Sequence, residues 1–127
     1  MPKRIGIIGS RRRASNKDYE KVEKVFLELY DNGDWLVSGH CHKGADEFCE
    51  RIMEKFGVPT LIFPARWKDW HNNWRVDEKA GFERNTWIAE NSDLLICAVS
   101  VDRSGGTEDT LRKFKRMGHP DDDIVMV

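Results

Sequence analysis

The chain has 127 residues, of which 39% are hydrophobic and 34% are charged, and this length suits one domain with one core. The apolar content is too high for an intrinsically disordered protein. Lys and Arg number 21 against 22 Asp and Glu, so the net charge of -1 gives no overall attraction to nucleic acid or to an anionic membrane. Any cationic site must therefore be local.

Apolar runs are short throughout the chain. None approaches the roughly 20 residues that a membrane helix needs. The first run, residues 5–8, is typical of a strand rather than of the core of a signal peptide. We therefore expect a cytoplasmic protein that does not contact a membrane.

The cysteines do not indicate a disulfide framework or a metal site. The chain has an odd number of cysteines, Cys41, Cys49 and Cys97, and no two of them form a CxxC pair. This pattern is typical of reduced thiols. His40 and His42 flank Cys41, but no distant cluster supplies the remaining ligands of a tetrahedral site. We expect neither a metal nor a required cofactor.

Strand-like and helix-like patterns alternate along the first half of the chain. Residues 4–8 form an apolar run, and apolar residues then recur at helical spacing over 19–29 until Gly33. Residues 35–37 predict a second strand. Residues 45–56 predict a second helix with one apolar face, and Gly57 lies just past its end.

The second half repeats this alternation. Strands are expected over residues 59–63, 94–99 and 124–127, the first of them at a sheet edge because Pro59 has no N–H to donate. Helices are expected over residues 83–91 and 107–117. The alternation indicates right-handed crossovers and a parallel sheet covered on both faces. We predict a single domain over residues 1–127: a Rossmann-like, doubly wound three-layer α/β sandwich of about five parallel strands in the order 3-2-1-4-5.

The loops after the strands suit an anionic ligand. Open α/β sheets bind ligands at the carboxyl ends of their strands, where glycines and helix N-termini present N–H groups to an anion. The candidate loops are Gly9-Ser10-Arg11-Arg12-Arg13, the segment from Ser38 to Asp46, and Gly105-Gly106-Thr107. Tight strand-to-helix turns alone would also explain the glycines. The occurrence of three such loops at one predicted edge favours a ligand site, and Thr107 is also a candidate helix cap.

Standard catalytic motifs are absent. No GxGxxG follows the first strand, and neither GxxxxGK[ST] nor GxSxG occurs. The sequence therefore gives no support to a hydride-transfer enzyme, a P-loop hydrolase or an acyl-transfer enzyme.

A stretch rich in tryptophan and a later Arg-Asn pair are further candidates. Trp67, Trp70 and Trp74 are spaced for one helical face, which favours packing or an oligomer contact over base stacking; Trp67 is the best candidate to lie beside a base. Arg84 could clamp a phosphate and Asn85 could bind a ribose or a base edge. The alternatives are a solvated arginine and a helix-capping asparagine.

Several short motifs occur in a characteristic order: Gly9-Ser10-Arg11, Ser38-Gly39, Lys43-Gly44-Ala45-Asp46, Phe63-Pro64-Ala65 with Trp67, Ala80-Gly81 with Arg84-Asn85, Asp93, and Gly105-Gly106-Thr107. In this order they resemble the YspA-like, YpsA-related branch of the SLOG superfamily over nearly the whole chain. The resemblance implies a Rossmann-like fold and a nucleotide or nucleotide-derived ligand; relatives include the Lonely Guy phosphoribohydrolases and the DNA-processing protein DprA. Loop chemistry and the resemblance together assign ligand-binding roles to Gly9, Ser10, Arg11, Ser38, Gly39, Lys43, Gly44, Asp46, Trp67, Arg84, Asn85, Gly105, Gly106 and Thr107.

The chain departs from the motif of the enzymatic members of this superfamily, most importantly at the catalytic glutamate. Lonely Guy enzymes carry PGGxGTxxE, whose final glutamate serves cleavage of an N-glycosidic bond, whereas Thr110 is the third residue after Thr107 here. Glu108 and Asp109 are close, but a shift of one residue rotates a helical side chain by about 100°. They are the candidate catalytic residues; the alternative is that they only favour the helix macrodipole.

Three functions follow as hypotheses. The leading one is binding or sensing of a nucleotide-like small molecule. The second is hydrolysis of a nucleoside monophosphate at its N-glycosidic bond. The third is binding of single-stranded nucleic acid as in DprA, against which the balanced charge weighs without excluding it. The resemblance also leaves a homo-oligomer, in the simplest case a dimer, open.

Overall fold

The computed structural model describes residues 2–10, 12–39, 45–63, 79–103 and 105–127. Within them, five parallel strands form one sheet in the order β3-β2-β1-β4-β5, which confirms the predicted fold class and strand order. The strands are β1 (Arg4–Gly9), β2 (Trp35–Ser38), β3 (Thr60–Ile62), β4 (Leu94–Ala98) and β5 (Ile124–Met126). The helices are α1 (Asn16–Leu29), α2 (Ala45–Phe56), α3 (Lys79–Asn91) and α4 (Gly106–Arg116), and the 3-10 turn Asp121–Asp123 precedes β5.

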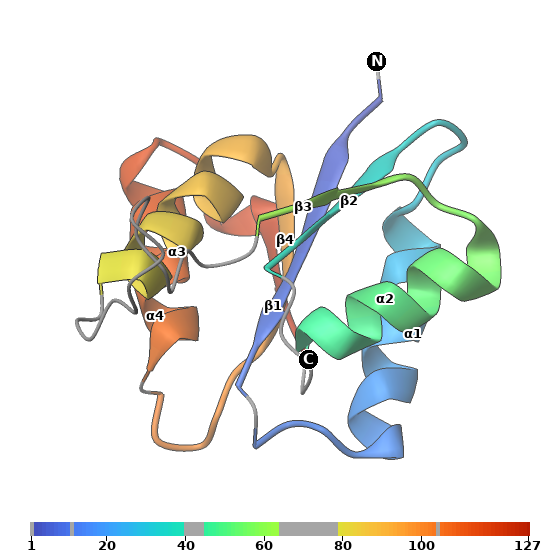
Figure 1. The fold of residues 1–127 in the computed structure, drawn as a ribbon, viewed down its shortest axis with the longest axis horizontal. Coiled ribbons are helices and arrows are strands. Elements are labelled where there is room, and N and C mark those ends of the chain that lie inside the picture. Colours follow the sequence, from blue (N-terminus) through green and yellow to red (C-terminus); the bar gives the residue numbers. More distant parts are fainter. Residues whose placement is uncertain (1, 11, 40–44, 64–78, 104) are drawn as a thin grey trace, which may run out of the picture.

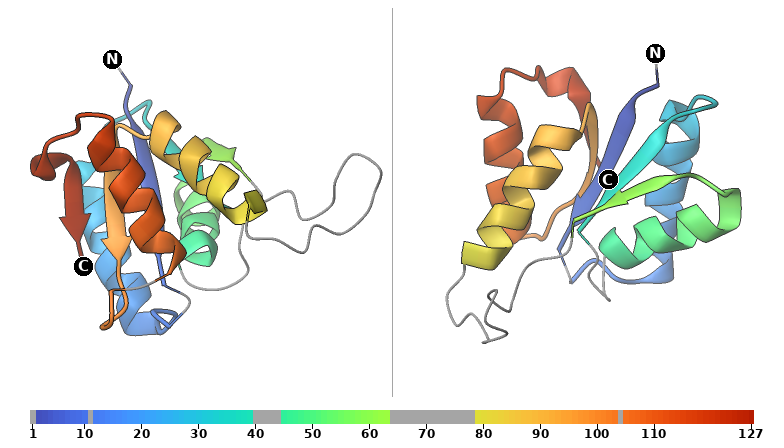
Figure 2. Two further views of the ribbon diagram at one scale, coloured as in Figure 1. Left: turned by 90° about the vertical axis from the view of Figure 1, so that its left-hand side faces the viewer. Right: turned by 45° about the horizontal axis from the view of Figure 1, so that its top comes forward.

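Two helical layers cover the two faces of the sheet (Figures 1 and 2). Helices α1 and α2 pack on one face, where Phe26 and Phe48 are fully buried. Helices α3 and α4 pack on the other face around Phe114. Successive residues of β1 serve opposite layers, since Ile7 belongs to the first cluster and Ile8 to the second. A strand buried on both faces explains why residues 5–8 are apolar without alternation.

The helix ends follow local signals with two exceptions. Helix α1 begins with a capping box between Ser15 and Asp18, and α2 ends before Gly57, whose φ is 65°. Helix α3 starts at Lys79, before the predicted residue 83, because a helix-weakening glycine in its first turn masks the pattern. The expected cap at Thr107 is wrong: α4 begins at Gly106 with Gly105 as N-cap and no side-chain cap, so Thr107 lies inside the first turn.

Strand β1 is central and pairs with both β2 and β4. From β1 the chain moves outward through β2 to β3, and it then returns to the other side of β1 as β4. The strand order therefore reverses between β1 and β4, and loops after these strands diverge from a shared edge. This edge lies at the bottom of Figure 1.

Within the described part of the chain, no helix combines the length and the apolar character needed to cross a membrane.

Close packing at the end of β1 leads to the first prediction. A Cβ added at Gly9 would lie 2.8 Å from the backbone oxygen of Ala98 and 3.1 Å from the Cβ of Ala45. Because a backbone atom of a central strand cannot retreat, we expect Gly9→Ala to lower the free energy of unfolding by about 1–3 kcal/mol in urea titrations.

Gly106→Ala is the matched control. Its added Cβ would meet only Asn85 Nδ2, at 3.5 Å, which is ordinary contact. We expect this substitution to leave stability unchanged or to raise it by up to about 1 kcal/mol, because Gly is entropically costly in a helix. A Gly9→Ala protein as stable as wild type would contradict the close approach of β1, β4 and α2.

Candidate functional site

The carboxyl ends of β1 and β4 are tied together at the point where the strand order reverses. Gly9 pairs with Ala98 in the parallel register, and the backbone N–H of Ser10 donates to Ala98 O at 2.8 Å. The loop after β1 therefore leaves the sheet directly beside the loop after β4. This is the place at which open α/β sheets receive ligands.

Helix α3 contributes a polar pair that joins the loop after β2 to the start of α4. Arg84 Nη1 donates to Gly39 O at 3.1 Å, and Arg84 Nε donates to Asn85 Oδ1 at 3.3 Å. Asn85 Nδ2 donates to Gly106 O at 3.3 Å and to Asp109 Oδ2 at 3.2 Å. Asn85 is 5% exposed and lies inside α3, so the helix-capping alternative is wrong. The structure thus brings together five residues that the sequence placed in three separate segments.

The two candidate catalytic carboxylates are both engaged by basic side chains. Glu108 accepts hydrogen bonds from Arg103 Nε and, at 3.3 Å, from Arg103 Nη2. Asp109 forms an ion pair with Lys113 Nζ at 2.8 Å as well as its bond to Asn85. Asp109 is therefore the carboxylate that contacts the Arg84–Asn85 pair, whereas Glu108 pairs with the loop after β4.

The loop between β4 and α4 has unusual backbone conformations. Arg103 has a φ of 54° and Gly105 a φ of 96°. A left-handed conformation is uncommon for a residue other than Gly, and such residues cluster at functional sites. The N-cap residue of α4 is Gly105, which has no side chain to cap the helix, and the N–H groups in the first turn of a helix are a place where an anion can bind.

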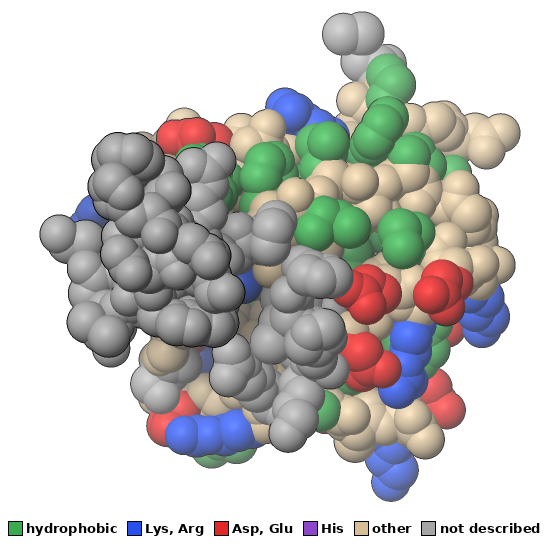
Figure 3. Space-filling model, in the orientation of Figure 1, with side chains coloured by type: hydrophobic (Ala, Val, Ile, Leu, Met, Phe, Trp, Pro, Cys, Tyr) green, Lys and Arg blue, Asp and Glu red, His purple; other side chains and the backbone are tan. Residues whose placement is uncertain are grey.

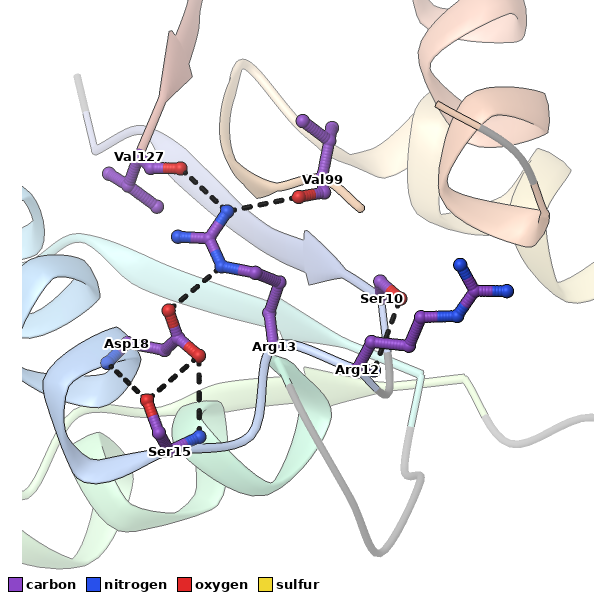
Figure 4. A network of polar contacts seen from close by, with 7 residues as sticks. All are labelled: Ser10, Arg12, Arg13, Ser15, Asp18, Val99 and Val127. Carbon is purple, nitrogen blue, oxygen red and sulfur yellow. Dashed lines mark hydrogen bonds and ion pairs between the residues drawn. The ribbon is translucent and has the colours of Figure 1, made fainter. Parts of the chain in front are cut away.

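The arginines described after β1 have different surroundings (Figure 4). Arg13 Nη1 donates to Val99 O at 3.0 Å and to Val127 O at 2.9 Å, and Arg13 Nε donates to Asp18 Oδ1 at 2.8 Å. Its side chain is 20% exposed. Arg13 therefore joins the loop after β1 to the segments that follow β4 and β5, and it contributes to the structure of this edge rather than facing solvent as a phosphate clamp.

The carboxylate of Asp18 is held in its charged form by this network. Burial raises its pKa, but hydrogen bonds from Arg13 and Ser15 outweigh that effect and the net pKa lies below the ordinary value. The contribution of the Arg13–Asp18 pair to stability is therefore present above the pKa of an unfolded aspartate, about 3.9, and is lost as the pH falls below it.

The remaining predicted ligand residues divide into three groups. Ser38 and Thr107 are buried, and Gly9 serves the close packing of strand and helix. Outside the described residues lie Arg11, Lys43, Gly44 and Trp67, together with the side chain of Asp46. Their ligand roles, like those of the other candidates, stay predictions.

The described part of the chain offers neither a metal cluster nor an activated thiol. No group of three or more His, Cys, Asp or Glu side chains in that part could hold a metal ion. Cys49 and Cys97 are buried and unbridged. Burial, followed by the nearby charge of Glu108, raises the pKa of Cys97 to about 12, so this thiol is not a nucleophile at neutral pH.

Sequence reasoning named Asp102 only as one further carboxylate that a hydrolase could recruit, and it did not predict the pair between Asp102 and Arg12. Asp102 Oδ2 accepts from Arg12 Nη1 at 2.8 Å, across a separation of 90 residues, and Asp102 Oδ1 accepts from Ser100 Oγ at 2.7 Å. No local sequence pattern predicts a contact between residues 90 positions apart. The Asp109–Lys113 pair, by contrast, has the spacing of four residues that favours ion pairs on a helix and was open to prediction.

Comparison with known proteins identifies the fold. No family model matches the sequence, and no curated protein matches it significantly. The structure is similar to DNA processing protein A from Helicobacter pylori, with a TM-score of 0.66 and 16% sequence identity over 98% of this chain. The chain spans 65% of that protein, whose structure was described for its unique single-stranded DNA binding mode. At this identity the similarity shows a shared fold.

The contrast between the two arginines gives a second prediction. We expect Arg13→Ala to lower the free energy of unfolding by about 2 kcal/mol or more at pH 7, because a largely buried carboxylate and two carbonyls lose their donor. Arg12→Ala should change it by less than about 1 kcal/mol, since its ion pair is exposed. Urea unfolding measures both values.

The pH dependence provides the control for this prediction. The difference between wild type and Arg13→Ala should shrink as the pH falls below about 4, where Asp18 is protonated in the unfolded chain. A difference that stays constant down to pH 2.5, or equal effects of the two substitutions at pH 7, would contradict the role assigned to Arg13.

Proposed function

We propose that the protein binds a nucleotide or nucleotide-derived small molecule at the edge formed by the carboxyl ends of β1, β2 and β4. The observation that carries this proposal is the polar chain from Gly39 through Arg84 and Asn85 to Gly106. It places a guanidinium group and a buried amide between the loop after β2 and the start of α4. A phosphate needs such a combination of a fixed cation and converging N–H donors.

Both positive charge and directed hydrogen bonds contribute to binding of the ligand. The first turn of α4, at Gly106 and Thr107, presents backbone N–H groups and the positive end of the helix dipole to a phosphate. Arg84 supplies positive charge from α3, where its Nη1 donates to Gly39 O in the loop after β2. Three of the ordered motifs that resemble the SLOG superfamily lie at or beyond the carboxyl ends of β1, β2 and β4 in sequence, which supports the proposal from a separate direction. They begin at Gly9, Ser38 and Gly105.

The arrangement of the carboxylates favours binding over hydrolysis. A general base that activates water needs a carboxylate aimed at the ligand. Glu108 is paired with Arg103, and Asp109 is paired with Lys113. Hydrolysis of an N-glycosidic bond by either of these two carboxylates would require the ligand to release its ion pair.

Binding of single-stranded DNA is the second candidate function. The similarity to DNA processing protein A over 98% of this chain supports it. The charges at this edge of the sheet give less support to DNA binding. Each of the basic side chains Arg12, Arg103 and Lys113 at this edge pairs with an acidic one, whereas polyanion binding relies on uncompensated cations.

The third prediction tests the leading proposal. Purified protein is denatured and released small molecules are identified by mass spectrometry, and binding of AMP, ADP and ADP-ribose is measured by thermal shift and calorimetry. We expect a nucleotide to bind wild type and Arg84→Ala to weaken this binding about tenfold to hundredfold, the equivalent of one charge-assisted hydrogen bond. The proposal is wrong if no nucleotide is retained and none of the three binds.

Arg116→Ala is the matched control for that experiment. Arg116 is exposed at the far end of α4, so its loss removes the same charge without touching the edge, and the affinity for nucleotide should not change. A parallel titration with a fluorescent single-stranded oligonucleotide at several salt concentrations tests the second candidate. Salt-sensitive binding of the oligonucleotide without nucleotide binding would replace the leading proposal with it.

A further inference from the structure

Arg12 and Arg13 are neighbours in sequence but point away from each other (Figure 4). Arg13 is directed into the protein, as described above. The Arg12 side chain is 70% exposed, and its Nη1 donates to Asp102 Oδ2 at 2.8 Å. Arg12 therefore carries the exposed positive charge of this loop in the part that the structure describes.

Asp102 is oriented by its own loop as well as by Arg12. Ser100, which is 5% exposed, donates from Oγ to Asp102 Oδ1 at 2.7 Å. The backbone N–H of Arg103 closes a turn onto Ser100 O at 3.1 Å. Each oxygen of the carboxylate thus has a different donor, and the negative charge is held in place before any ligand arrives.

The Arg12–Asp102 pair bridges the two loops that leave the sheet at the reversal of strand order. Arg12 follows β1 and Asp102 follows β4, and these strands are neighbours. The backbone N–H of Arg12 also donates to Ser10 Oγ at 3.1 Å, and Ser10 is one of the candidate ligand residues. The loop that contains the candidate Ser10 therefore also carries a guanidinium group that is already paired with the fixed carboxylate of Asp102.

We propose that Asp102 is a built-in competitor for the anionic ligand: it occupies the Arg12 guanidinium in the empty protein, and ligand phosphate must displace it. This inference rests on the proposed function. An exposed ion pair is weak and screened by salt, so a phosphate carrying two charges can replace the single carboxylate. The bridge then raises the ligand concentration that is needed to fill the site. It also links entry of the ligand to separation of the loops after β1 and β4.

A purely structural bridge would have the opposite effect on binding. If the pair only ordered the two loops, its loss would loosen the site and weaken the binding of ligand. If Asp102 competes with ligand, its neutralisation removes both the competition and the repulsion. The sign of the change in affinity therefore separates the two roles.

The fourth prediction is the effect of Asp102→Asn on the affinity for ADP, measured by calorimetry at low salt. Asn keeps an oxygen that can accept from Ser100, so the turn is retained while the charge is lost. We expect binding to tighten about threefold to tenfold, the range of an exposed ion pair and the repulsion that it replaces. In 0.5 M salt, where charges at the surface are screened, wild type and Asp102→Asn should bind ADP with nearly equal affinity.

Asp31→Asn is the matched control, because Asp31 is an exposed partner of Lys3 ahead of β1, at the opposite end of the sheet, with an N···O distance of 2.7 Å. It removes the same charge and should leave the affinity for ADP unchanged. In an Arg12→Ala background, Asp102→Asn should tighten ADP binding by at most half as much as it does in wild type. The reason is that the Arg12–Asp102 ion pair is already absent there.

Each outcome decides between the inference and the function on which it rests. Weaker or unchanged ADP binding by Asp102→Asn, or equal tightening by Asp31→Asn, overturns the competitor role while the proposed function stands. If none of AMP, ADP and ADP-ribose binds wild type or Asp102→Asn, and the variant unfolds at the same temperature as wild type, then nucleotide binding and the competitor role both fail.

Discussion

The parallel pairing of β1 with β2 on one side and β4 on the other is the constraint on which the candidate site depends. It places the carboxyl ends of three strands at one edge, and it forces the loops after β1 and β4 to leave in opposite directions. Gly9 allows β1 to end against Ala98 and Ala45 with no side chain between them. The polar loops meet because these apolar strands pack so closely.

Local charge compensation shapes the chemistry of this edge. Arg12, Arg103 and Lys113 each pair with an acidic residue from the loop after β4 or from α4. On the face seen in Figure 3, acidic and basic side chains also lie beside one another on the side of α1 and α2. This compensation is why we propose a compact phosphate, which directed N–H groups can bind, rather than an extended polyanion, which needs uncompensated cations.

The arginines after β1 show how similar residues acquire different roles. Arg13 is drawn inward because the carbonyls of Val99 and Val127 and the carboxylate of Asp18 converge on it. Arg12 donates instead to Asp102, which lies in the neighbouring loop after β4. One residue joins the ends of β4 and β5 to α1, and the other remains at the surface where a ligand can compete for it.

The sequence alone determined the fold class and most element boundaries, because these follow from periodicity and from local signals such as Gly57 after α2. The strand order predicted together with that fold class is the one found. The sequence also placed Arg84, Asn85 and Gly106 among the candidate residues. The tertiary structure decided which of them touch. The Asn85–Gly106 contact, the Arg12–Asp102 pair and the inward turn of Arg13 join residues 21, 90 and 86 positions apart. Such contacts depend on how strands are ordered and how helices pack across the sheet, and no local pattern encodes that geometry.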